Sequence, residues 1–264
     1  MTEITAGEVI AWLTAGLSLP PATVDGLLAG EEGMAVSGVV TAFSASVPVI
    51  RQAVRLQANL LITLEGMYYS HRDDPELRDN PVAADKARLV AEAGLAVYRC
   101  HDGIHRRTPD SVTEGLVRAL GWDRYPVRHL SEAAIVELPG LTAAEAAAEV
   151  KEKLGLGYVR VAGNPSVPCR RAGLLVGYRG GGRNVIPLIR KEGLDLVIAG
   201  EGPEWETPEF VKDANELGGA SALLMLGHAE SEEPGMELLA EQLRRQFSGM
   251  PVFFVRDRPA FRVL

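Results

Sequence analysis

Apolar runs of strand length alternate with helical patterns through most of the 264-residue chain. Several runs are nearly continuous, which is typical of strands buried on both faces of a parallel sheet. The alternation predicts an α/β fold. The expected strands are 36–43, 59–65, 95–101, 133–138, 158–162, 173–177, 195–199, 222–227 and 252–255, and the expected helices are 47–56, 83–93, 111–120, 142–154, 184–192, 209–217 and 235–247, besides an amphipathic helix at the N-terminus.

A gapless repeat relates the two halves of the chain. Residues 49–66 (VIRQAVRLQANLLITLEG) align with residues 185–202 (VIPLIRKEGLDLVIAGEG). Each copy predicts a helix, a short turn and a buried strand that ends in Glu-Gly, so Glu65 is expected to be equivalent to Glu201. We therefore expect two similar α/β lobes related by an internal pseudo-twofold repeat.

The next strand in each half also ends alike. The first runs into HDGIH, with His101 and His105, and the second into HAESE, with His228 and Glu232. This predicts that His101 and His228 are equivalent. The expected division is a first lobe over residues 1–130 and a second over 165–264, with 131–164 as a connecting helix and strands.

Composition excludes several classes of protein. No apolar run approaches the ~20 residues of a membrane-spanning helix. The net charge of -8 argues against nonspecific nucleic-acid binding, which depends on basic surface. The two cysteines, Cys100 and Cys169, form no C-x-x-C pair, and the acidic N-terminal sequence lacks the basic region of a secretory signal. We expect a cytoplasmic protein.

Titratable side chains gather at the expected carboxyl ends of strands, where open α/β sheets bind ligands. Imidazole and carboxylate together form the ligand set of zinc, manganese, iron or cobalt. Alone, a Glu after a strand is commonly a solvated turn residue, and H-x-x-x-H is often two surface histidines. The prediction of a metal site rests on these residues occurring together, since three of the five histidines fall at these strand ends. The candidates are Glu65, His101, His105, Glu201, His228 and Glu232.

Five segments carry motifs of one known family. Three short segments match family motifs: DGLLAG (25–30) is similar to D-N-x-G-L-Q-x-G, YRCHDGIH (98–105) is similar to Y-x-x-H-T-x-x-D, and GHAESE (227–232) is similar to G-H-x-x-x-E. Two longer segments match family regions. Residues 39–66 are similar to a strand–helix–strand unit ending in I-T-H-H-P, and residues 163–201 are similar to a glycine-rich region ending in T-G-E. Over nearly its whole length the chain resembles the NIF three-like family, whose members often carry the name GTP cyclohydrolase I type 2 homolog. The resemblance implies two similar lobes, a dinuclear metal centre, and a ring-shaped homohexamer built as a trimer of dimers.

The chain departs from the family at two ligand positions. Leu64 and Glu65 stand where the family has paired histidines, and His105 stands where it has an aspartate. Glu65 can bind a metal and Leu64 cannot. The resemblance thus implies Glu65, His105, His228 and Glu232 as ligands of one or two divalent ions. His101 matches a family histidine that more often orients a ligand.

Three functions fit these residues. The first is a metal-dependent hydrolase of a small phosphorylated or nucleotide-like substrate, with Glu201 as general base or a further ligand. The second is a non-catalytic metal-binding or regulatory scaffold whose ring assembly is its functional feature, which the loss of a histidine at Leu64 favours. The third is a protein that keeps the fold of an enzyme but has lost its metal.

Weaker candidates lie near these ends. The turn 177–183 (GYRGGGR) precedes an expected helix, where backbone N–H groups can hold an anion, although a flexible turn is the simpler interpretation. Tyr68, Tyr69 and His71 follow Glu65 and could line a pocket entrance. Cys100 lies inside an expected strand, which favours a small core residue over a nucleophile.

Overall fold

The computed structural model describes residues 3–72 and 74–263. The chain forms two compact units: unit 1 comprises Met1–Ser111 and Met236–Leu264, and unit 2 comprises Val112–Gly235. Each unit has its own sheet, so the α/β prediction is confirmed. Two helices span the division, α6 (Ser111–Ala119) and α10 (His228–Gln246). Within the described residues no helix combines the length and the apolar character required to cross a membrane.

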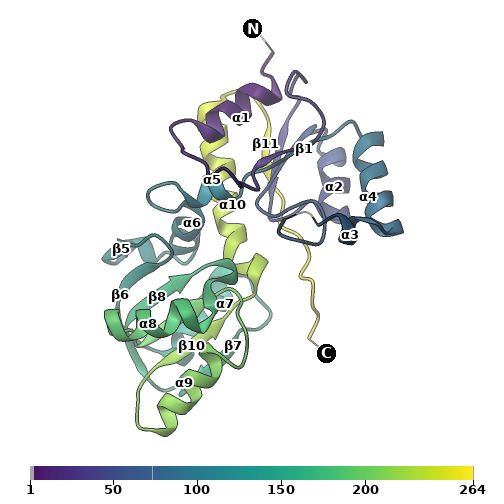
Figure 1. Ribbon diagram of the computed structural model, residues 1–264. Coiled ribbons are helices and arrows are strands. Elements are labelled where there is room, and N and C mark those ends of the chain that lie inside the picture. The colour runs from purple at the N-terminus through teal and green to yellow at the C-terminus, as the bar shows by residue number, and fades with distance from the viewer. Residues whose placement is uncertain (1–2, 73, 264) are drawn as a thin grey trace. The chain divides into compact units, whose positions relative to one another are not determined.

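Unit 1 holds a five-stranded sheet of order β1-β4-β3-β2-β11 (Figure 1). Strands β11, β2, β3 and β4 run parallel, and β1 is antiparallel to β4. Its strands are β1 (Gly26–Ala29), β2 (Val39–Ala42), β3 (Leu60–Thr63), β4 (Ala96–Arg99) and β11 (Val252–Phe254), and its helices are α1 (Ala6–Thr14), α2 (Val47–Arg55), α3 (Pro75–Arg78), α4 (Pro81–Glu92) and α5 (Asp102–His105).

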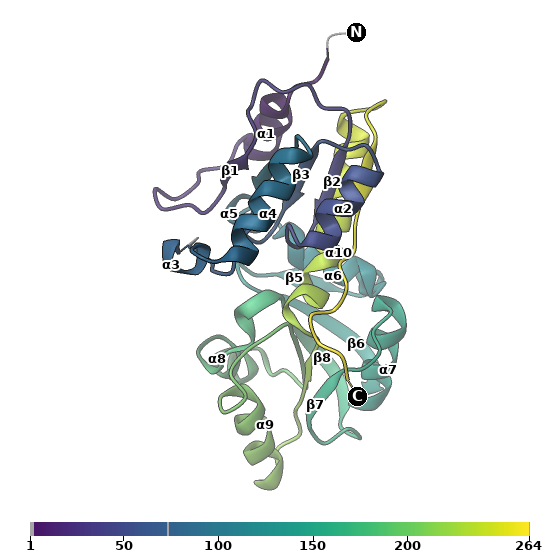
Figure 2. The same cartoon turned by 90° about the vertical axis from the view of Figure 1, so that its right-hand side faces the viewer.

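Helices cover both faces of this sheet. Helices α2 and α4 lie side by side on one face, and the later part of α10 lies on the other (Figures 1 and 2). The hydroxyl of Thr41 on β2 donates a hydrogen bond to the carbonyl oxygen of Met236 on α10, at 2.8 Å. Every residue of β2, β3 and β4 is buried. Each fully buried Leu or Ile there contributes roughly 1.5–3 kcal/mol of hydrophobic stabilisation, which explains the continuous apolar runs.

Unit 2 holds a six-stranded sheet of order β5-β6-β8-β9-β10-β7. Strands β8, β9 and β10 run parallel, and the remaining pairings are antiparallel. Figure 2 shows α8 and α9 on one side of the sheet and α7 on the other. Its strands are β5 (Val127–His129), β6 (Ala134–Thr142), β7 (Arg160–Gly163), β8 (Pro168–Leu175), β9 (Leu196–Ala199) and β10 (Ala222–Met225), and its further helices are α7 (Ala143–Leu154), α8 (Gly182–Glu192), α9 (Thr207–Glu216) and the 3₁₀ helices η1 (Trp122–Arg124) and η2 (Gly177–Gly180).

The repeat is confirmed by strand order. In unit 1 the order β1-β4-β3-β2 matches β7-β10-β9-β8 in unit 2, with the same directions. Leu60 pairs with Ala96, as Leu196 pairs with Ala222. Glu65 lies five residues after Leu60 on β3, and Glu201 lies five residues after Leu196 on β9. The two glutamates are therefore equivalent.

The histidines are offset by one residue. His101 lies five residues beyond Ala96, whereas His228 lies six residues beyond Ala222. Gly227, whose φ is +119°, therefore stands at the position equivalent to His101. The extra residue places His228 as the first residue of α10.

The division of the chain differs from the predicted one. Residues 131–164 were expected to connect the lobes, but they contain β6, α7 and β7, which belong to unit 2. The reason is strand pairing, since β6 pairs with β8 and β7 with β10. The edge strands β1 and β5 and the four-residue helices α3 and α5 were not predicted, because such short elements carry too little periodicity.

Candidate metal centre

One group of potential metal ligands lies in unit 1. Glu65, His71 and His101 each offer a ligand atom, and these atoms all lie within 4.8 Å of one another. Glu65 follows β3 and His101 follows β4, two adjacent parallel strands whose carboxyl ends meet at one sheet edge. The loop after β3 then brings in His71, which was predicted only as an entrance residue.

The His101 ring lies between two carboxylates. Its Nδ1 is 3.2 Å from Oδ1 of Asp102, and its Nε2 is 3.6 Å from Oε1 of Glu65. Asp102 favours the proton on Nδ1, which leaves the lone pair of Nε2 facing a carboxylate oxygen. Two ligand atoms about 2.1 Å from one tetrahedral metal ion lie about 3.4 Å apart. The spacing of Nε2 and Oε1 fits a shared cation.

The protonation state of His101 agrees with this arrangement. Burial of the ring, with the neighbouring His105 as the second cause, lowers the pKa of His101 below its ordinary value, against the opposing effect of Glu65. The ring is therefore biased toward the neutral form, which is the form that binds a metal ion.

Arg99 fixes the loop that carries Glu65 and His71. From β4 its buried guanidinium donates to Oε2 of Glu65 at 2.6 Å, to the carbonyl oxygen of His71 at 2.6 Å and to that of Leu64 at 3.3 Å. Its Nη2 also lies 3.2 Å from Nδ1 of His71, so a metal ion at that nitrogen would compete with Arg99. The other carboxylate oxygen of Glu65, Oε1, faces Nε2 of His101 at 3.6 Å. The sequence shows Arg99 only as a charge within an apolar strand, and its role was not predicted.

His105 lies beside this group rather than in it. Its ring centroid is 5.0 Å from that of His101, and its Nδ1 is 3.1 Å from a carboxylate oxygen of the buried Asp110. An orienting carboxylate at Nδ1 directs Nε2 toward a ligand role. Asp110 was not predicted.

Asp25 explains why the DGLLAG motif belongs to the site. Its Oδ1 accepts hydrogen bonds from the backbone N–H of His101 at 2.8 Å and of Asp102 at 2.6 Å, and its Oδ2 accepts one from Gly103 at 2.8 Å. These bonds fix the turn between β4 and α5, so they set the position of the His101 ring.

Unit 2 repeats the pattern around His228. Its Nδ1 is 3.2 Å from Oε2 of Glu201, and its Nε2 is 3.1 Å from Oε2 of Glu232, one helical turn further along α10. Glu232 is 3% exposed and Glu201 is 47% exposed. As in unit 1, one carboxylate orients the ring and a second faces Nε2. The chemistry of this donor set fits a divalent cation.

Gly177 leaves space beside these ligand atoms. A Cβ at this position would lie 2.2 Å from Oε1 of Glu232 and 3.2 Å from Nε2 of His228. The glycine is held there by Ser231, whose hydroxyl accepts from the N–H of Gly177 at 2.9 Å and donates to the carbonyl oxygen of His228 at 2.8 Å. A side chain at position 177 would therefore fill the space beside the donor atoms.

The glycine-rich turn gives no support to an anion site. Oε2 of Glu206 accepts a hydrogen bond from the backbone N–H of Gly182 at the start of α8, at 2.7 Å. The carboxylate of the chain itself thus lies where an anion would bind. Glu65, His101 and His105 lie in unit 1 and Glu201, His228 and Glu232 in unit 2, and their union in one centre stays a prediction.

Comparison with known proteins gives one consistent family. The family model of Duf34/NIF3 (NGG1p interacting factor 3) matches residues 22–259. The chain is 23% identical over 227 residues to a GTP cyclohydrolase 1 type 2 homolog of Clostridium acetobutylicum, covering 83% of this chain and 80% of that protein.

Solved structures show the same fold. The crystal structure of Staphylococcus aureus protein SA1388 matches with a TM-score of 0.81 at 16% identity, over 98% of this chain and 99% of that one. A Bacillus cereus protein related to NIF3 matches with a TM-score of 0.76 at 14% identity, over 100% of both chains.

Proposed function

The chain belongs to the Duf34/NIF3 family, and from that premise we propose that it is a divalent-metal-dependent hydrolase of a small phosphorylated or nucleotide-like substrate. One observation carries the proposal. In each unit a histidine at the carboxyl end of a parallel strand has one carboxylate at Nδ1 and a second facing Nε2. That arrangement prepares the imidazole for a metal ion.

The proposed ligands come from both units. We assign Glu65 and His101, with His105 beside them, from unit 1, and His228 and Glu232 from unit 2. They would hold one or two ions per chain, and their oxygen and nitrogen donors suit zinc, manganese, iron or cobalt. The dinuclear centre implied by the family resemblance supports joining the two groups.

The chain's own residues have separable roles in this proposal. Asp102 and Glu201 keep the proton of each imidazole on Nδ1, at 3.2 Å in both cases. Glu201 is half exposed, so its second oxygen can accept a proton from water, which keeps the predicted role as general base. A bound divalent ion would supply Lewis-acid polarisation of the scissile bond and a water of lowered pKa.

Metal analysis and a turnover screen test the proposal together. Protein purified without added metal is measured by elemental analysis and assayed against phosphoesters and nucleotides. We expect His228→Ala to lower both metal content and turnover, and His129→Ala to change neither, because His129 contacts Glu114 at 3.0 Å, outside both groups. His71 is no suitable control, since its ring nitrogen lies among the potential ligand atoms of unit 1. Absence of metal from the parent protein would refute the proposal.

A non-catalytic metal-binding scaffold is the second candidate. The observation that favours it is the reduced ligand set of unit 1, where Leu64 is fully buried and Arg99 takes one oxygen of Glu65. Metal without turnover on any substrate class would support the scaffold over the hydrolase.

The assembly proposed for either function is a ring-shaped homohexamer, a trimer of dimers. It rests on the family resemblance alone. Light scattering at micromolar protein should report about six times the 28.3 kDa of one chain, and a stable single-chain particle would contradict it.

A further inference from the structure

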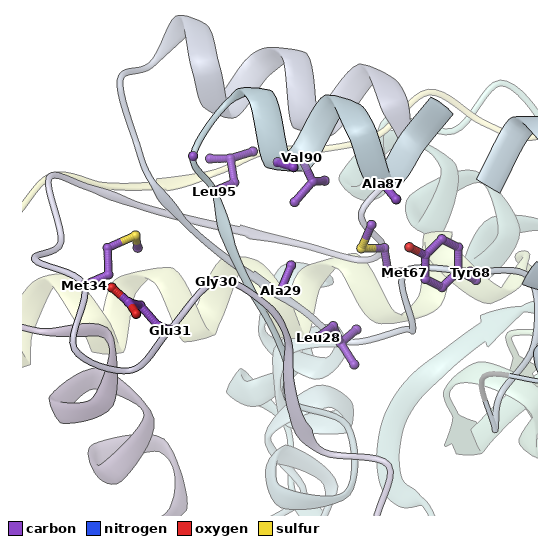
Figure 3. A pocket seen from close by; sticks show the side chains of 12 residues that line it. Leu28, Ala29, Gly30, Glu31, Met34, Met67, Tyr68, Ala87, Val90 and Leu95 are labelled. Atoms are coloured by element: carbon purple, nitrogen blue, oxygen red, sulfur yellow. The ribbon is translucent and has the colours of Figure 1, made fainter. Parts of the chain in front are cut away.

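A cavity of about 340 Å³ lies in unit 1, between β1 with its following loop and helix α4 (Figure 3). Leu28 and Ala29 line it from the strand, and Ala87 and Val90 from the helix. Met67, from the loop after β3, lies at one end (Figure 3). The volume lies at the lower end of the range of small-molecule sites.

The repeat shows that this space is not demanded by the fold. Helix α4 precedes β4 as α9 precedes β10, and each helix is followed by a glycine of positive φ, Gly94 at +60° and Gly218 at +88°. Counted back from these glycines, Ala87 is equivalent to Val211 and Ala91 to Asn215.

The strand side of the cavity has its own counterpart. Gly163 ends β7 opposite Ala222, and Gly30 follows β1 at the equivalent place, with φ values of +85° and +82°. In unit 2 a Cβ on Gly163 would lie 2.9 Å from Cγ1 of Val211 and 3.0 Å from Nδ2 of Asn215. Side chains therefore fill the space in unit 2, whereas two alanines leave it open in unit 1.

The residues that line the cavity indicate which kind of ligand would fit. The walls are apolar, and Met34 and Met67 are unbranched side chains that adapt to a variable shape. Glu31 lies near Met34, at the end away from Met67 (Figure 3). Within the described part of the chain, the Glu31 carboxylate makes no hydrogen bond or ion pair. A positively charged group would complement it.

We propose that this cavity binds a small amine with a compact apolar body, held between Ala87 and Ala29 with its ammonium group toward Glu31. The proposal is independent of the metal centre, because every residue that it uses lies outside the proposed ligands.

Methyl NMR of the full chain tests the proposal. Phenethylamine is titrated into protein carrying ¹³C-methyl methionine, at neutral pH where the amine is protonated. We expect saturable shifts of the Met34 and Met67 methyl groups and none of Met225 or Met236, which do not line the cavity. Absence of saturable shifts at Met34 and Met67 overturns the proposal.

Variants that copy unit 2 make the test specific. Ala87→Val should weaken binding at least tenfold, because the added methyl groups occupy the cavity, and Ala91→Asn should also weaken it. Ala84→Val, the same change at an exposed position of α4, is the matched control. Circular dichroism checks that each variant is folded. If neither Ala87→Val nor Ala91→Asn weakens binding, the proposal is wrong.

The charge of the ligand is tested by Glu31→Gln. The variant should bind phenethylamine about threefold more weakly, as expected for an exposed ion pair, and should bind neutral 2-phenylethanol as the parent does. Equal loss for both probes would refute the role of Glu31. If the Met34 and Met67 signals instead shift with protein concentration in the absence of ligand, a second copy covers the cavity and the proposal fails.

Discussion

Replacing Gly177 by alanine adds a single methyl group beside the proposed metal ligands of unit 2 and so tests that proposal. The substitution introduces no charge and removes no hydrogen-bonding group. Its Cβ would lie 2.2 Å from Oε1 and 2.8 Å from Cδ of Glu232. The buried carboxylate must therefore move away from position 177, which disturbs the contact of its Oε2 with Nε2 of His228, now at 3.1 Å.

The magnitude follows from two separable contributions. Gly177 has φ +60°, and an alanine in this left-handed region costs about 1 kcal/mol of folding stability. The contact with Glu232 adds to this, since a carbon and an oxygen atom do not approach to 2.2 Å. Loss of a residue that only orients a metal ligand lowers metal affinity by about 10–100-fold, or about 1.4–2.8 kcal/mol. We expect at least this effect when Glu232, a proposed ligand, is displaced.

Gly193→Ala is the matched control. Gly193 follows α8 with φ +64°, and a Cβ there would have no atom within 4 Å. Gly193→Ala would have the same backbone strain as Gly177→Ala, but its Cβ would contact no carboxylate. Chelator competition measures metal affinity, and denaturant unfolding measures stability. Both variants should lose about 1 kcal/mol of stability from the backbone, while Gly177→Ala alone should lose metal affinity.

The reasoning fails if Gly177→Ala and Gly193→Ala bind metal equally tightly. That result would mean that Glu232 does not bind the ion, or that the carboxylate moves without leaving it. Elemental analysis of both variants, purified in parallel without added metal, gives an independent measure of the same difference.

Three further predictions follow from individual side chains. Asp102→Asn removes the charge at Nδ1 of His101 and should lower metal affinity about 10–100-fold in chelator competition; unchanged affinity would exclude an orienting role. Burial raises the pKa of Cys100 to about 12 and that of Cys169 to about 11, so iodoacetamide at pH 8 should label neither thiol in native protein and both in urea; native labelling would contradict their burial. Burial lowers the pKa of Lys86 from 10.5 to about 8, against an opposing effect of Asp257. Between pH 8 and pH 10.5 the lysine is protonated more in the unfolded chain than in the folded one. The free energy of unfolding of the parent, measured relative to that of Lys86→Met, should therefore rise with pH. A difference that stays constant from pH 8 to 10 would refute this.

Local pattern and the repeat were enough to predict the α/β class and the two related lobes. Continuous apolar runs predicted β2, β3, β4, β9 and β10, because strands covered on both faces need apolar side chains at every position. The match of 49–66 with 185–202 predicted two lobes with Glu65 and Glu201 in equivalent places. The edge strand β1 (Gly26–Ala29) carries no such requirement, and only its pairing with β4 in the folded chain reveals it.

The sequence by itself determined which donor atoms the protein has and that they follow parallel strands. Only the tertiary structure decided which nitrogen of His101 and of His228 is oriented and which faces a carboxylate. Glu201 reaches His228, and Arg99 holds Glu65, through contacts between residues about 30 positions apart in the chain. The tertiary structure also decided the one-residue offset of His228, since register is set by pairing between strands. Periodicity reports how a segment is buried, whereas hydrogen-bond geometry depends on contacts between residues far apart in the chain.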